Sequence, residues 1–116
     1  MFMLTATALL LSFDQSPPTS RPAVPTYAEA LRCSGLTQAA SELEGGESGE
    51  GQALYDAALY WSLTTIQSSQ AARRPTATVE AEMMRARVQA VRELTARNET
   101  ALTALSACRA RTPSLG

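Results

Sequence analysis

Apolar side chains recur at intervals of three and four along most of the chain after residue 26, the spacing of one face of an α-helix. The interruptions of this pattern predict three helices, over residues 26–43, 50–74 and 76–111. Alanine occupies 21 of the 116 positions and Val, Ile and the aromatic residues are few, which favours helix over strand. We therefore predict one all-α domain over residues 26–112, a small antiparallel bundle of three helices.

Capping signals bound the predicted helices. Thr26 followed by Glu29 matches a capping box, in which hydroxyl and carboxylate satisfy free backbone amides at a helix start. The glycine pair at 45–46 is expected to end the first helix, and Gly35 is expected to kink or split that helix. Pro75 separates the second helix from the third, which Thr76 or Thr78 is expected to cap.

The third segment carries the longest apolar stripe. Its members recur at alternating spacings of three and four: Val88, Val91, Thr95, Asn98, Leu102 and Leu105. Neither Gly nor Pro interrupts it before Pro113, so a continuous helix of about 50 Å is predicted. A break near 97–98 with the chain folding back is the alternative. The first half of this helix is expected to pair with the second helix through Leu59, Leu63, Ile66, Val88 and Val91.

Residues 1–25 differ in composition from the rest of the chain. Residues 1–13 are uncharged and mostly apolar, and a proline-rich stretch follows them. A helix of that length falls short of the ~30 Å hydrocarbon core of a membrane but suits the apolar region of a secretory signal peptide. No basic residue precedes the run and no A-x-A site follows it, so an uncleaved anchor stays open. We predict a periplasmic or secreted protein, cleaved or tethered at its N-terminus, with a cytosolic chain as the alternative.

Two cysteines, Cys33 and Cys108, stand 75 positions apart, too far for CxxC redox chemistry or a zinc ligand cluster. In an exported chain they are expected to form a structural disulfide, which brings their Cα atoms within about 7 Å and joins the first helix to the last. Two free thiols in a reducing compartment are the alternative.

Charge is unevenly distributed around a net value of -1. Residues 1–70 carry two Arg and seven acidic residues, whereas residues 71–116 carry eight Arg and four. We expect the acidic first part to lie on the basic last helix. A face of Arg85, Arg92 and Arg97 for an acidic partner is the weaker hypothesis, because Glu82, Glu93 and Glu99 are interleaved with it. Nucleic-acid binding is not expected.

The chain contains no His and no Lys, and Asp14 and Asp56 are its only aspartates. The commonest general base, the commonest metal ligand and all lysine chemistry are thereby missing, so we predict no enzyme, no cofactor and no metal site. The acidic Gly-rich loop at 44–51 lacks a calcium-loop pattern. A carboxylate-only enzyme using Asp56 is an unlikely alternative.

Tyr55, Tyr60 and Trp61 concentrate three of the aromatic residues in the second predicted helix. They are predicted either to pack in the core or to form a surface for a protein partner, where Tyr and Trp are over-represented. The function expected from the sequence is a non-catalytic exported protein acting by protein–protein interaction or as a scaffold in the cell envelope. A small periplasmic chaperone or stress protein that exposes apolar helix faces is the alternative. No motif in the sequence points to a known family.

Overall fold

A computed structural model describes residues 24–114 of the chain and contains four α-helices in that range. They are α1 (Tyr27–Glu44), α2 (Gly49–Ala71), α3 (Thr76–Thr95) and α4 (Glu99–Ala110). The predicted all-α class is confirmed, whereas the predicted number of three helices is wrong. The apolar segment and most of the proline-rich stretch lie outside the described residues.

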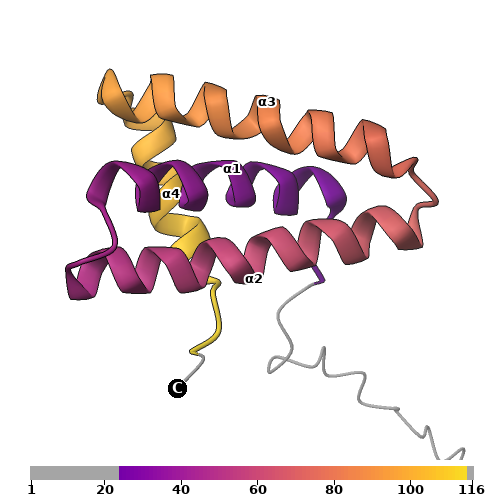
Figure 1. Cartoon of the computed structure of the whole chain (residues 1–116), viewed down its shortest axis with the longest axis horizontal. Helices are drawn as coiled ribbons and strands as arrows, with labels where there is room; N and C mark the ends of the chain where they lie inside the picture. The colour runs from indigo at the N-terminus through magenta and orange to yellow at the C-terminus, as the bar shows by residue number, and fades with distance from the viewer. Residues whose placement is uncertain (1–23, 115–116) are drawn as a thin grey trace, which may run out of the picture.

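Helix α1 occupies the middle of the bundle (Figure 1). Helices α2 and α3 flank it on two sides, α4 crosses it on a third, and α1 contacts all three. Helices α2 and α3 hardly touch each other, so the predicted pairing between them is wrong. Leu59, Leu63, Ile66 and Val88, which were expected to form that contact, are partly exposed.

The predicted long third helix is in fact two helices, because the chain turns at residues 96–98. The Arg97 amide donates to the Leu94 carbonyl and the Asn98 amide to the Glu93 carbonyl, the hydrogen bonds of a Schellman motif. Arg97 takes the left-handed conformation, with φ of 56°, and the Asn98 side chain caps α4 by accepting from the Ala101 amide. The alternative of a break near 97–98 is therefore the one observed, and α4 then turns across α1 instead of folding back along α3. An arginine in the position that glycine usually fills hid this helix end in the sequence.

Helix α1 is buried almost all round, and small side chains allow this. Its buried residues are Ala30, Cys33, Ser34, Gly35, Leu36, Thr37, Ala39 and Ala40. At Gly35 the α1 backbone approaches α3 so closely that an added Cβ would lie 2.6 Å from the Ala86 carbonyl oxygen. A residue with a side chain would push the two helices apart there, so the glycine serves close packing, and α1 continues through it instead of splitting.

Most predicted helix ends are confirmed. The Thr26 hydroxyl accepts from the Glu29 amide and donates to the Glu29 carboxylate. The Ser48 hydroxyl caps α2 by accepting from the Gly51 amide. Gly45, with a left-handed φ of 84°, follows α1 directly. The cap position of α3 is Pro75 and no side chain caps it, so the prediction of a threonine cap is wrong.

Candidate binding surfaces

The two cysteines meet in the centre of the bundle. Cys33 of α1 and Cys108 of α4 form a disulfide with their Cα atoms 5.4 Å apart and their Sγ atoms 2.13 Å apart. Both residues are almost fully buried in a core cluster that also includes Leu36, Trp61 and Ala90. The disulfide thus ties the central helix to the helix that crosses it.

The three aromatic residues of α2 do not share one surface. Trp61 is fully buried, and its indole Nε1 donates to the Cys108 carbonyl and to the Thr112 hydroxyl, at 3.2 and 2.9 Å. The Tyr60 ring lies edge-on to the Trp61 ring, whereas Tyr55 is 56% exposed. Trp61 therefore holds the end of α4 against α2, and only Tyr55 lies largely open to solvent.

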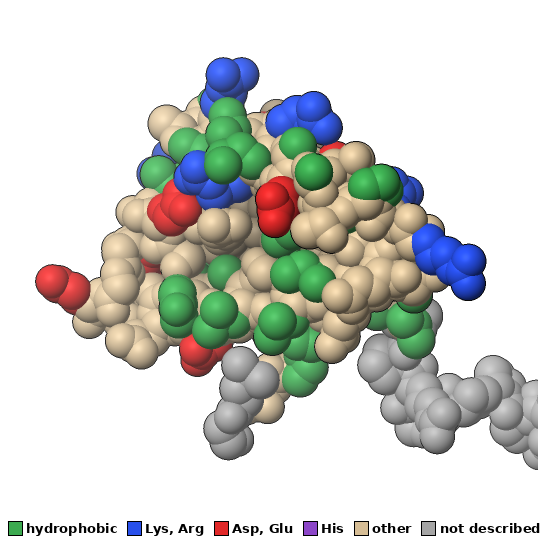
Figure 2. All heavy atoms as spheres, turned by 45° about the vertical axis from the view of Figure 1, so that its right-hand side comes forward, with side chains coloured by type: hydrophobic (Ala, Val, Ile, Leu, Met, Phe, Trp, Pro, Cys, Tyr) green, Lys and Arg blue, Asp and Glu red, His purple; other side chains and the backbone are tan. Residues whose placement is uncertain are grey.

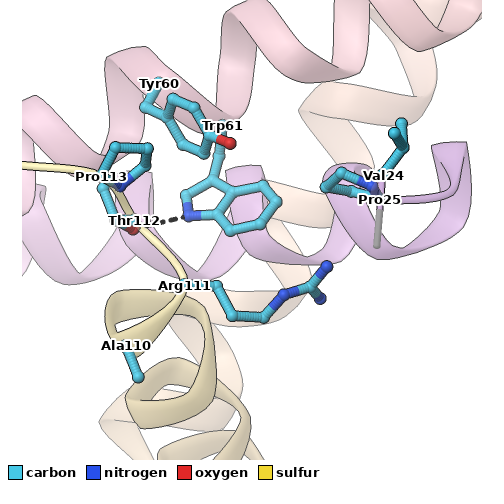
Figure 3. A pocket seen from close by; sticks show the side chains of 8 residues that line it. All are labelled: Val24, Pro25, Tyr60, Trp61, Ala110, Arg111, Thr112 and Pro113. Carbon is cyan, nitrogen blue, oxygen red and sulfur yellow. Dashed lines mark hydrogen bonds between the residues drawn. The ribbon is translucent and has the colours of Figure 1, made fainter. Parts of the chain in front are cut away.

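A hollow of about 540 Å³ lies beside Trp61, at the C-terminal end of α4 (Figure 3). Its wall consists of side chains from both ends of the described chain and from α2: Val24, Pro25, Tyr60, Trp61, Ala110, Arg111, Thr112 and Pro113. The Arg111 guanidinium lies 5.5 Å from the centre of the Trp61 ring. Arg111 also pairs with Glu29, so the charge at this hollow is already neutralised. The hollow is mainly apolar, and it brings together no general base or nucleophile.

A second apolar surface lies on α2. Tyr55, Leu59, Leu63 and Ile66 recur at spacings of four, four and three, so they share one face, and they are 56, 44, 60 and 41% exposed. Figure 2 shows hydrophobic side chains gathered along the lower part of the molecule, where α2 lies. We call these four residues the α2 stripe. The sequence pattern had placed Leu59, Leu63 and Ile66 in the core. An apolar periodicity identifies a helix face, but it does not show whether another element covers that face.

Four ion pairs join the helices. The bidentate pair is Arg32 with Glu93, at 2.7 and 3.0 Å, and the others are Arg87 with Glu42, Arg109 with Glu50 and Arg111 with Glu29. Three of them connect a C-terminal arginine to an N-terminal glutamate, as the charge distribution predicted. Within residues 24–114 none of the salt bridges involves Arg85, Arg92 or Arg97.

The carboxyl groups whose pKa values are shifted belong to these ion pairs. Hydrogen bonds from Arg32, Arg109 and Arg111 hold the pKa values of Glu93, Glu50 and Glu29, respectively, below their usual range. A lowered pKa keeps a carboxylate ionised and unsuited to donate a proton near neutral pH. These shifts therefore reflect ion pairing between helices.

Among the described residues, no three Cys, Asp or Glu side chains come together as a metal-binding group. No helix in that part of the chain is both long and apolar enough to span a bilayer. In comparisons with known proteins, no family model, no curated protein and no solved structure matches the chain.

Proposed function

We propose that the protein works in an oxidising compartment, in the cell envelope or after secretion, as a non-catalytic helical protein that acts by protein–protein interaction or as a scaffold. The observation that carries this proposal is the buried Cys33–Cys108 disulfide. Disulfides persist in oxidising compartments and are rare in the cytosol, where thiols are kept reduced. The apolar residues 1–13 support the same conclusion, because they suit a secretory signal.

The absence of catalysis is supported by composition and by the shifted groups. The chain has no His and no Lys, and the shifted glutamates are held by arginines. Binding is supported by the α2 stripe, whose apolar side chains face solvent without a partner in the described chain.

The intact mass of the protein from its native host, combined with cell fractionation, tests the proposal. We expect a mass two hydrogens below that of the dithiol, in the envelope or the medium. A full-length, fully reduced chain in the soluble cytosol would overturn the proposal.

A chaperone that exposes apolar helix faces is the second candidate function. Exposed apolar side chains on two helices favour it, Leu63 on α2 and Met84 and Val88 on α3. The purified protein should then slow the aggregation of an unfolded client, and reduction of the disulfide should alter this activity. No effect on aggregation, with or without reductant, would eliminate the candidate.

A further inference from the structure

We propose that the α2 stripe is a dimer interface, and that it binds the same stripe on a second copy of this chain with the two α2 helices antiparallel. This deepens the proposed function, because it names the partner of an exposed surface, and it rests on the premise that the protein acts through that surface. A protein that stays monomeric would refute the dimer and leave the proposed compartment standing. A reduced chain in the cytosol would refute the compartment and leave the dimer standing.

The first argument is that the middle of α2 offers a partner no charge. Between Asp56 and the end of α2, 15 successive residues carry no Asp, Glu, Lys or Arg. Leu63, in the centre of this stretch, is the most exposed member of the stripe. A charged partner surface would leave its own charges unpaired against α2, whereas an identical uncharged stretch leaves none unpaired.

The second argument is the placement of charge at the two ends of α2. The acidic residues of the helix, Glu50 and Asp56, lie in its N-terminal third, and Arg73 and Arg74 follow its C-terminal end. Antiparallel pairing therefore brings the acidic end of each helix to the basic end of the other, while parallel pairing brings like charges together. Within the range 24–114 Glu50 is paired with Arg109 and Arg74 with Glu82, whereas neither Asp56 nor Arg73 forms a salt bridge. Asp56 and Arg73 are therefore the charges that a second copy can pair.

The third argument is register. A two-fold axis beside residues 62–63 sets Leu59 of each copy against Ile66 of the other, on either side of the axis, and the two Leu63 side chains meet near it. Tyr55, the N-terminal member of the stripe, then lies opposite Gln70 of the other copy. The same register sets Gln52 opposite the partner's Arg73. Asp56 of that helix lies one turn, about 6 Å, beyond Gln52, a distance that an arginine side chain spans. One register thus pairs the apolar centre with itself and brings Asp56 and Arg73 of opposite copies within one turn of each other.

The size of the stripe determines the strength of this dimer. Four partly exposed side chains cover less than the ~800 Å² per partner of a standard protein interface. We therefore expect a reversible dimer with a dissociation constant of about 10–100 µM. Because unlike charges contribute at both ends, raising the salt concentration should weaken it.

Sedimentation velocity of the oxidised full chain across a range of protein concentrations tests the proposal. Leu63→Glu should raise the dissociation constant at least tenfold, because it introduces a charge at the two-fold axis. Met84→Glu is the matched control, since Met84 is 57% exposed on α3 and Leu63 is 60% exposed on α2. Circular dichroism should show both variants folded.

A charge exchange tests the antiparallel orientation. Asp56→Arg and Arg73→Asp should each weaken the dimer severalfold, and the two changes together in one chain should restore it. A wild-type protein that stays monomeric up to about 1 mM would overturn the proposal. So would a dimer that Leu63→Glu leaves intact, since another segment would then hold it, or one that Met84→Glu disrupts equally. Failure of the double exchange to restore the dimer would overturn the antiparallel register.

Discussion

Helices α1 and α2 differ in burial in the opposite sense from the one that their sequences suggest. Helix α1 is composed largely of small and polar residues and lies in the centre of the bundle, with Ser34 and Thr37 buried. Helix α2 carries a regular apolar stripe, yet that stripe faces solvent. Small residues allow the neighbouring backbones to approach α1 closely. The bulky residues of the α2 stripe face away from the other three helices, whereas Leu54 and Trp61 on the opposite side of α2 are buried. In this bundle the helix with the smaller side chains is the central one.

Polar groups in α1 are buried at low cost because each has a hydrogen-bond partner, in α1 itself or in α2. The Thr37 hydroxyl donates to the Cys33 carbonyl at 2.7 Å, one turn earlier, and the Ser34 hydroxyl lies 3.2 Å from that of Ser62. Buried hydroxyls with such partners avoid the penalty of about 1–3 kcal/mol for an unmade hydrogen bond.

The largest effect should come from removing the disulfide that anchors α1. Replacing Cys33 and Cys108 together by Ser releases a loop of 75 residues, and we expect the free energy of unfolding to fall by about 4–5 kcal/mol. Urea unfolding of the oxidised wild type and of the variant measures this. Because α1 contacts every other helix, hydrogen exchange should accelerate in all four helices together. Acceleration confined to α1 would contradict its central position.

A matched pair of leucine truncations sharpens the comparison directly. Leu36 of α1 is fully buried and Leu63 of α2 is 60% exposed. Leu36→Ala should cost about 3 kcal/mol through lost burial and a residual cavity, and Leu63→Ala less than about 0.5 kcal/mol. Urea unfolding gives both values when it is measured at a protein concentration low enough that self-association is negligible. Equal costs would show that the α2 stripe is covered in solution.

Gly35→Ala probes the close approach of α1 to α3. The new methyl group would lie 2.6 Å from the Ala86 carbonyl oxygen, and the helices must move apart. Overpacking of this kind should destabilise the protein by about 2 kcal/mol, although alanine is the better helix former. Gly46→Ala, where an added methyl group meets nothing within 4 Å, is the control and should be nearly neutral. A stabilised Gly35→Ala protein would show that the two helices separate freely.

Arg97→Gly should stabilise the turn that sends α4 across α1. Arg97 holds a left-handed φ of 56°, which costs an ordinary residue about 1 kcal/mol and glycine almost nothing. We expect a gain of about 0.5–1 kcal/mol in thermal or urea unfolding. Arg92→Gly, inside α3, should instead destabilise by about 1 kcal/mol. A loss of stability in the Arg97 variant would argue for a continuous helix through residue 97.

A small effect that depends on pH should come from the ion pair that ties α1 to α3. The pKa of Glu93 is lowered in the folded protein by hydrogen bonds from Arg32, so the pair stabilises the fold above the unfolded pKa of about 4.3. This contribution disappears as pH falls through the lower, folded pKa. Glu93→Gln should therefore cost less than about 1 kcal/mol at pH 7, and progressively less as pH falls through the folded pKa of Glu93.

Unfolding of wild type and Glu93→Gln across this pH range makes the comparison. Glu80→Gln, an exposed change on the same helix, serves as control. A difference between wild type and Glu93→Gln that does not change with pH would rule out the carboxylate charge as its cause.

The sequence by itself determined the local structure and the covalent link. The helix class, the Thr26 cap, the end of α1 before Gly45 and the start of α3 directly after Pro75 follow from residues within one or two turns of each other. The Cys33–Cys108 pairing followed because two cysteines allow only one intramolecular disulfide.

Tertiary structure decided which helix lies inside and which apolar face stays exposed. The periodicity of α2 shows that Leu59 and Leu63 share a face, but the contacts that cover or expose that face come from residues far away in the chain. The turn at Arg97 could likewise not be predicted from the sequence, because its left-handed residue is not glycine. The hydrogen bonds of the turn and the packing of α4 across α1 hold it in place. Local propensities act over a few residues, whereas burial depends on how all four helices fill the same space.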